Sequence, residues 1–85
     1  MTNKTNPVNI HAYKRSFKKT IGKILIEERL ARNIRIEFLS KQLQIPIKSI
    51  EQIELGQSDY NWLTLYKILD FYNKQISITL VDNKP

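Results

Sequence analysis

The sequence predicts a mainly α-helical domain of four to five helices, followed by one C-terminal β-strand. Apolar residues recur at helical spacing through most of residues 16–74, and capping residues and a proline separate the segments. Residues 76–81, ISITLV, then change to an alternating pattern rich in β-branched residues, which is typical of a strand. The 85 residues form one domain, because half that length would be too short to bury a core.

The first helix is expected to begin between Ser16 and Thr20, since either residue is an acceptable N-cap, and to end near Arg32. Gly22 lies inside this helix at a cost of about 1 kcal/mol relative to alanine, which indicates close backbone packing there. The apolar residues that fall at helical spacing are Phe17, Ile21, Ile24 and Leu25.

Two short helices are expected next, the first over residues 36–43. Pro46 cannot occupy a helix interior but suits the first helical position, so the second is expected from Pro46 to about Leu55. Gly56 then ends it as the glycine that follows a last helical turn. The residues expected to face the core are Phe38, Leu39, Ile50 and Ile53.

A fourth helix, residues 62–72, is expected after Asn61, a good N-cap. It is apolar nearly all round, which is typical of a helix buried on more than one side. In so small a protein, the second burial surface is most easily another subunit, and the lone strand then pairs with its copy in a two-fold dimer. The alternative is an extended tail docked on its own domain. The expected dimer interface is Trp62, Tyr66, Phe71, Ile76, Ile78 and Leu80.

The net charge of +6 is unevenly distributed along the chain. Residues 1–35 hold nine Lys or Arg and two Glu, which gives +7, and residues 36–85 hold five Lys and six acids, which gives −1. A basic segment on a small domain favours a polyanionic partner, usually nucleic acid. The alternatives are a solubilising tail and a membrane surface, and the second fits poorly because the segment has no clear amphipathic face.

The residue inventory excludes several classes of function. The chain has no cysteine and one histidine, His11, which excludes a thiolate zinc site, a two-histidine metal motif and a Ser-His-Asp triad. With two glycines it has no Gly-rich phosphate loop, so we expect no enzyme, no cofactor and no metal. No apolar run approaches the about 20 residues that span a bilayer, and the start is not a signal peptide, so a cytoplasmic protein without a membrane partner is expected.

Two short helices joined by a tight turn and preceded by another helix form the helix-turn-helix arrangement. Residues 21–69 resemble the Cro/phage-repressor (XRE-type) helix-turn-helix family. The matching residues are Ile21-Gly22, Arg29, Leu39-Ser40, Leu43, Ile45 and above all the stretch S49-I-E-Q-I-E-L-G56. The far end, L63-T-L-Y-K-I-L-D70 with the strand after it, is similar to the C-terminus of HipB-like antitoxins. In those proteins a terminal strand builds a dimer that represses its own operon and binds a toxin kinase.

The resemblance implies roles for particular residues. Arg29 and Glu54 are expected to form a largely buried ion pair, since a buried carboxylate needs a cationic partner. The third helix is expected to enter the major groove, where Gln52 suits adenine, Lys48 guanine or a phosphate, and Ile47 a thymine methyl. The full set of expected DNA-contacting residues is Arg35, Ile36, Lys41, Pro46, Ile47, Lys48, Ser49, Gln52 and Gln57.

Four positions depart from the family pattern. Arg35 and Ile36 stand where a small polar cap and a glutamine are usual, Gln44 where glycine is usual, and Pro46 where serine or threonine is usual. Proline removes a backbone donor and a hydroxyl that often serve DNA binding. These changes favour a second reading, in which the helix-turn-helix is the scaffold of a protein-interaction module with weak or no DNA binding.

The predicted organisation therefore has three parts: a flexible basic arm over residues 1–15, a helix-turn-helix DNA-binding domain over 16–74, and a dimerising strand and tail over 75–85. The expected function is that of a sequence-specific repressor, an autoregulatory antitoxin. Its expected partners are double-stranded DNA with an inverted-repeat operator, a second copy of the chain, and a HipA-like toxin kinase.

Overall fold

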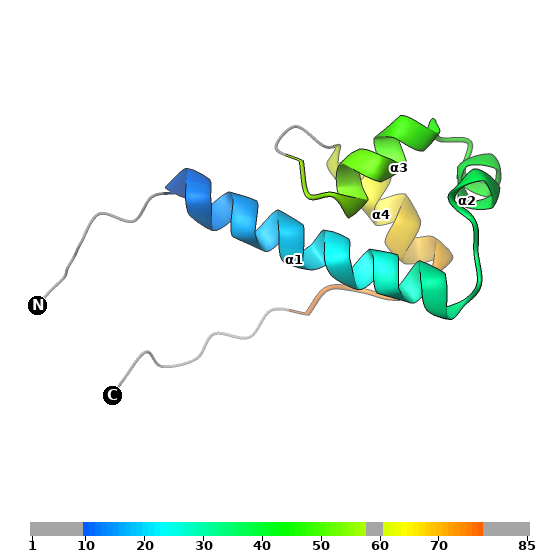
Figure 1. The fold of residues 1–85 in the computed structure, drawn as a ribbon, viewed down its shortest axis with the longest axis horizontal. Helices are drawn as coiled ribbons and strands as arrows, with labels where there is room; N and C mark the ends of the chain where they lie inside the picture. The colour runs from blue at the N-terminus through cyan, green and yellow to red at the C-terminus, as the bar shows by residue number, and fades with distance from the viewer. Residues whose placement is uncertain (1–9, 58–60, 78–85) are drawn as a thin grey trace, which may run out of the picture.

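A computed structural model of the chain describes residues 10–57 and 61–77, with side chains from residue 15 onward. The described part holds four helices: α1 (Ile10–Ala31), α2 (Ile36–Leu43), α3 (Ile47–Glu54) and α4 (Trp62–Phe71). The three shorter helices gather over the C-terminal half of α1, and its N-terminal half projects beyond them (Figure 1). The mainly helical class is thus confirmed.

From α2 onward the helix boundaries agree with the sequence prediction to within one residue, although Pro46, predicted as the first residue of α3, is instead its N-cap, with extended backbone at ψ 143°. α2 begins and ends where predicted, and Asn61 caps α4 by accepting a hydrogen bond from the Leu63 N–H at 2.7 Å. The predicted start of α1 is wrong, because Ser16 and Thr20 lie inside the helix, where the Thr20 hydroxyl donates to the Ser16 carbonyl at 2.9 Å. Residues 10–15 of the predicted arm therefore belong to α1, and the rest of that arm lies outside the described residues.

Both glycines of the chain lie where α1 crosses α3. A Cβ on Gly22 would meet the carbonyl oxygens of Ile53, at 2.7 Å, and of Glu54. Gly56 adopts φ +67° after the end of α3, and a Cβ there would lie 2.7 Å from the backbone nitrogen of Lys19. The two backbones therefore approach each other more closely than any residue with a side chain would allow, as the sequence predicted for Gly22.

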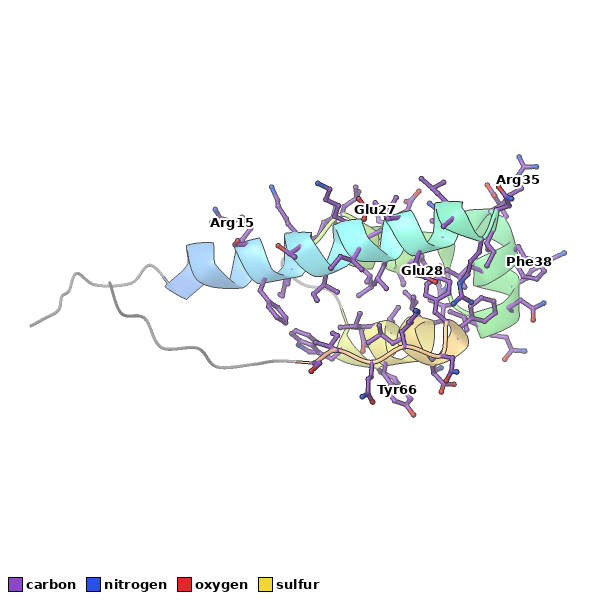
Figure 2. All side chains as sticks on the ribbon, turned by 90° about the horizontal axis from the view of Figure 1, so that it is seen from below. Arg15, Glu27, Glu28, Arg35, Phe38 and Tyr66 are labelled. Atoms are coloured by element: carbon purple, nitrogen blue, oxygen red, sulfur yellow. The ribbon has the colours of Figure 1, made fainter. Side chains whose placement is uncertain are left out.

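The core lies between α1 and the three shorter helices. Its buried members are Leu25, Leu39, Ile45, Ile50, Ile53, Leu65, Ile68 and Tyr72. The expected burial of Phe38 is wrong, since its side chain is 49% exposed and points from the first turn of α2 away from the domain (Figure 2). Neighbouring helix positions point about 100° apart, so the burial of Leu39 turns Phe38 away from the core.

The described part of the chain contains no strand. Residues 74–77 follow α4 without regular structure, so the predicted strand is not found at Ile76, and Ile78 and Leu80 lie outside the described residues. The physical reason is that this strand was expected to pair only with a second copy, and a single chain offers it no partner. No helix in the part that the structure describes is both long and apolar enough to cross a membrane.

Candidate nucleic-acid interface

The turn between α2 and α3 is fixed by local hydrogen bonds. Gln44 ends α2 in the left-handed conformation, with φ 56°, and its N–H donates to the Lys41 carbonyl at 3.3 Å. The Ser40 hydroxyl donates to the carbonyl of the buried Ile45 at 2.6 Å, across the same turn. A left-handed residue with a Cβ costs about 1–2 kcal/mol, which explains why glycine suits this position better than Gln44.

The turn mounts α3 with one face in the core and the other toward solvent. Ile50 and Ile53 are fully buried, whereas Lys48 and Glu51 are exposed. Ile47 is 36% exposed, and Ser49 and Gln52 are half-buried at the edges of the outer face. The four side chains predicted to enter a groove thus lie on the face of α3 that the core leaves open. They are Ile47, Lys48, Ser49 and Gln52.

The remaining predicted DNA contacts lie around this face. Lys41, Pro46 and Gln57 are exposed, on α2, before α3 and after α3 respectively. Arg35 and Ile36 lie at the other end of α2, one helix length of about 12 Å from the turn. Neither α2 nor α3 has a side-chain cap at its N-terminus, so the first amides of both helices are available to an anion.

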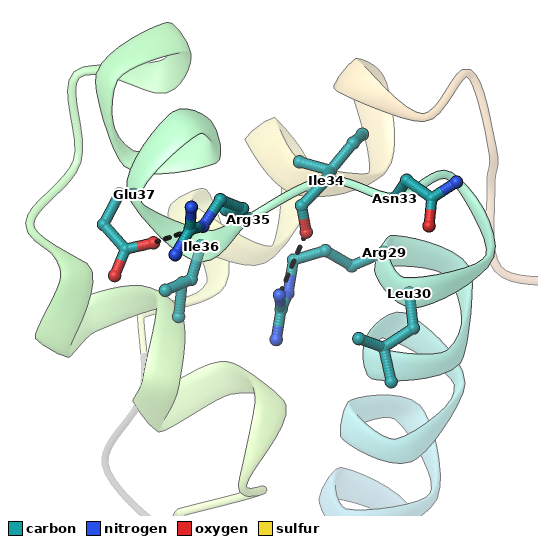
Figure 3. Close-up of a pocket in the computed structure, with 7 residues that line it drawn as sticks. All are labelled: Arg29, Leu30, Asn33, Ile34, Arg35, Ile36 and Glu37. Carbon is teal, nitrogen blue, oxygen red and sulfur yellow. Dashed lines mark hydrogen bonds and ion pairs between the residues drawn. The ribbon is translucent and has the colours of Figure 1, made fainter.

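A hollow of about 370 Å³ opens at the junction of α1 and α2 (Figure 3). The residues that line it are Arg29, Leu30, Asn33, Ile34, Arg35, Ile36 and Glu37. Arg29 donates to the Ile34 carbonyl at 3.1 Å, whereas the Arg35 side chain is 88% exposed and 4.0 Å from Glu37. Ile36 packs against the core and gives the hollow an apolar wall. Arg29 is held by the Ile34 carbonyl, so Arg35 is the arginine here that can reach a phosphate.

Arg29 and Glu54 form the ion pair that the family resemblance implied. Arg29 Nε lies 2.8 Å from Glu54 Oε2 and Nη2 lies 3.1 Å from Oε1, so the contact is bidentate. The Glu54 side chain is 5% exposed and that of Arg29 is 15% exposed. The hydrogen bonds to Glu54 raise the pKa of Arg29, so the guanidinium stays charged. This pair fixes the end of α3 against α1.

A second cluster joins the C-terminal ends of α1 and α4, and the sequence analysis did not predict it. Arg32 Nη2 donates to the Tyr72 carbonyl at 2.9 Å, and its guanidinium lies 4.9 Å from the centre of the Tyr72 ring. Arg32 also pairs with Glu28 at 2.7 Å. The four-residue spacing of Glu28 and Arg32 could have predicted the ion pair between them. No sequence pattern predicts the contact of Arg32 with Tyr72, forty positions away.

One side of α4 carries exposed apolar side chains, although Lys18 of α1 lies over the Trp62 ring, 5.9 Å from its centre. Trp62, Leu63 and Tyr66 are 56%, 59% and 64% exposed, and Tyr66 points away from the domain (Figure 2). Of the other predicted interface residues, Phe71 packs partly against the core and Ile76 is 36% exposed. Trp62, Leu63 and Tyr66 form apolar surface of α4 that the core of one chain does not cover.

Within residues 10–57 and 61–77, no group of three or more His, Cys, Asp or Glu side chains is placed to hold a metal ion. Compared with models of known protein families, the chain matches none, and a comparison with curated proteins finds no significant match. The case for a function therefore rests on the residues and their geometry.

Proposed function

We propose that this chain is a sequence-specific DNA-binding repressor that acts as a two-fold dimer on an inverted-repeat operator. The observation that carries the proposal is the mounting of α3. Its inner face is fully buried at Ile50 and Ile53, and its outer face carries the exposed Lys48 and, at its edge, the half-buried Gln52. A short, rigidly held helix with donors and acceptors on one open face has the size and chemistry to read a major groove.

The ion pair between Arg29 and Glu54 supports the same proposal. A reading helix must keep its register relative to the phosphates, because groove contacts depend on placement within a fraction of an ångström. The bidentate contact, with two bonds at 2.8 and 3.1 Å, restrains α3 both along and around its axis. Uncapped amides at the N-termini of α2 and α3, together with the exposed Arg35, add groups suited to phosphate contact.

The test is selection of binding sites from random duplex DNA with the purified protein. We expect enrichment of an inverted repeat whose half-sites are one helical turn, about 34 Å, apart. The double variant Lys48→Glu/Gln52→Ala should lose that preference and still fold. Gln42→Ala, an exposed change on α2, is the control and should select the wild-type site. Selection of the same site by the double variant would show that α3 is not the reading helix.

The antitoxin role is part of the proposal through the C-terminal resemblance to HipB-like antitoxins. In this form the dimer represses its own operon and binds a HipA-like toxin kinase. The check is a reporter driven by the promoter upstream of the gene, with and without the co-expressed neighbouring gene product. Repression that requires the selected site supports autoregulation, and co-purification of that defined product with the repressor supports the toxin partner.

A protein-interaction module is the second candidate function, and the apolar face of α4 favours it. Trp62, Leu63 and Tyr66 are each more than half exposed. Aromatic side chains such as Trp and Tyr are enriched in the cores of protein interfaces relative to the rest of the surface. In this reading Pro46 and Ile36 have removed DNA contacts. Failure of the folded protein to enrich any duplex sequence would favour the module over the repressor.

A further inference from the structure

The positive charge of the described chain lies mainly on α1 and not on the helix-turn-helix. Residues 36–57 hold two lysines, Lys41 and Lys48, against three glutamates, so this segment carries no net positive charge. The first acidic residue of α1 is Glu27, and the part of the helix before it holds several lysine and arginine residues. Because phosphate neutralisation supplies most of the affinity for duplex DNA, the segment that reads bases needs cations from elsewhere in the chain.

Three of the α1 cations form a row, which we call the α1 stripe: Arg15, Lys19 and Lys23. They are spaced four residues apart, so their side chains lie above one another on one side of the helix. All three are exposed, and Arg15 extends from the side of α1 away from α4 (Figure 2). The stripe is about 12 Å long, which matches the axial length of about three to four phosphates on one strand.

The α1 stripe lies beside the end of α3. A Cβ on Gly56 would lie 2.7 Å from the backbone nitrogen of Lys19. The turn after α3 therefore packs directly against the backbone of Lys19. Gln57, one of the expected phosphate contacts, follows directly and is exposed. The segment after α3 lies next to the middle of α1, at the level of the stripe (Figure 1). A duplex held against Gln57 therefore has its backbone within reach of Lys19.

The charges of the stripe are not neutralised within the described residues. The ion pairs of that part of the chain use Arg29, Arg32 and Arg35. Like charges four residues apart on a helix repel and destabilise it by a few tenths of a kcal/mol for each pair. A polyanion that binds along the stripe removes this repulsion.

We propose that the α1 stripe binds the sugar–phosphate backbone of duplex DNA next to the groove that α3 enters, and supplies most of the salt-dependent affinity. This inference rests on the proposed function, since it names the second contact of the same interface. It assigns affinity to α1 and sequence selection to α3.

The test compares two double variants that remove the same charge. Lys19→Gln/Lys23→Gln alters the stripe, and Lys67→Gln/Lys74→Gln removes two exposed lysines on and just after α4. Binding of a fluorescent 30-base-pair duplex of random sequence is measured by anisotropy over a series of NaCl concentrations. Thermal melts of both variants establish that they are folded.

The stripe variant should lower the slope of log K against log salt by about 1.8, since each phosphate contact contributes about 0.9. Its affinity at about 0.1 M salt should fall by about 60-fold by the same relation, and the α4 variant should keep the wild-type slope. Equal losses in both variants would mean that only net charge matters, and no loss in the stripe variant would place the contact elsewhere; either result overturns the inference but not the repressor. No binding by the wild-type protein at any salt concentration would overturn both.

Discussion

Arg29 and Glu54, twenty-five residues apart, meet in a bidentate ion pair that joins the C-terminal part of α1 to the end of α3. Glu54 is nearly inaccessible to solvent, so its charge is compensated by Arg29 and not by water. A buried pair of this kind is a weak source of net stability, but the loss of one partner leaves an uncompensated charge. The main effect of the pair is therefore to fix the position of α3 relative to α1.

Arg29→Ala should destabilise the domain by about 3 kcal/mol, because Glu54 would remain buried without a cation. For a domain of this size that corresponds to a fall in Tm of at least about 12 °C in a thermal melt followed by circular dichroism. The matched control is Arg35→Ala, whose pair with Glu37 spans 4.0 Å between highly exposed side chains. That change should cost less than about 0.5 kcal/mol. Similar losses of stability in the two variants would contradict this role of the Arg29–Glu54 pair.

Gly22→Ala should also destabilise the domain, although alanine is the better helix former. The new methyl group would collide with the carbonyl oxygens of Ile53 and Glu54, which belong to helix backbone and cannot turn aside. We expect a loss of about 2–3 kcal/mol, which exceeds the gain of about 1 kcal/mol in helix propensity. Ser16→Ala, an exposed site on the same helix, is the control and should leave Tm unchanged or slightly higher. A more stable Gly22→Ala variant would mean that α1 and α3 are farther apart than described.

Tyr72 should make stability depend on pH at the alkaline end. Burial raises its pKa to about 12, against an ordinary value of 10.0. The folded state therefore holds the phenolic proton more tightly than the unfolded state does. This contribution is fully present below about pH 10 and is lost as the pH rises toward 12, by about 2–3 kcal/mol in all.

Tyr72→Phe tests this dependence directly. Its hydroxyl is buried without a hydrogen-bond partner among the described residues, so removal should leave stability at pH 7 unchanged or slightly higher. Urea unfolding at pH 9 and 11.5 should show a smaller loss of stability for the variant than for the wild type. Tyr66→Phe, at a 64% exposed site, is the control and should follow the wild type. Parallel pH profiles for all three proteins would exclude Tyr72 as the titrating group.

The features that could be predicted from sequence are those with a local signal. Asn61 before an apolar run specifies the start of α4, and Gly56 the end of α3. The ion pair of Arg29 and Glu54 followed from the family resemblance and from the need of a buried acid for a cation.

The features that could not be predicted depend on tertiary context. Ser16 and Thr20 are preferred as N-caps, but inside a helix they cost less than about 1 kcal/mol each relative to alanine, so local preference does not fix where α1 begins. The contact of Arg32 with Tyr72 joins helix ends whose meeting is set by packing. The strand predicted over residues 76–81 is not found at Ile76, because an alternating pattern does not supply the neighbouring strand that a ladder needs.

The apolar face of α4 gives the last prediction, because the repressor proposed above requires two copies. Tyr66→Glu places a charge at the centre of the exposed face formed with Trp62 and Leu63, where the domain core has no use for the side chain. We expect the wild type to sediment as a dimer and the variant as a folded monomer, since an unpaired charge in an apolar interface is costly. Gln42→Glu, which adds the same charge at an exposed site on α2, is the control and should still dimerise. A variant Tyr66→Glu that sediments as a dimer would move the interface away from α4, and a second variant lacking residues 75–85 would then show whether the tail alone holds the two copies together.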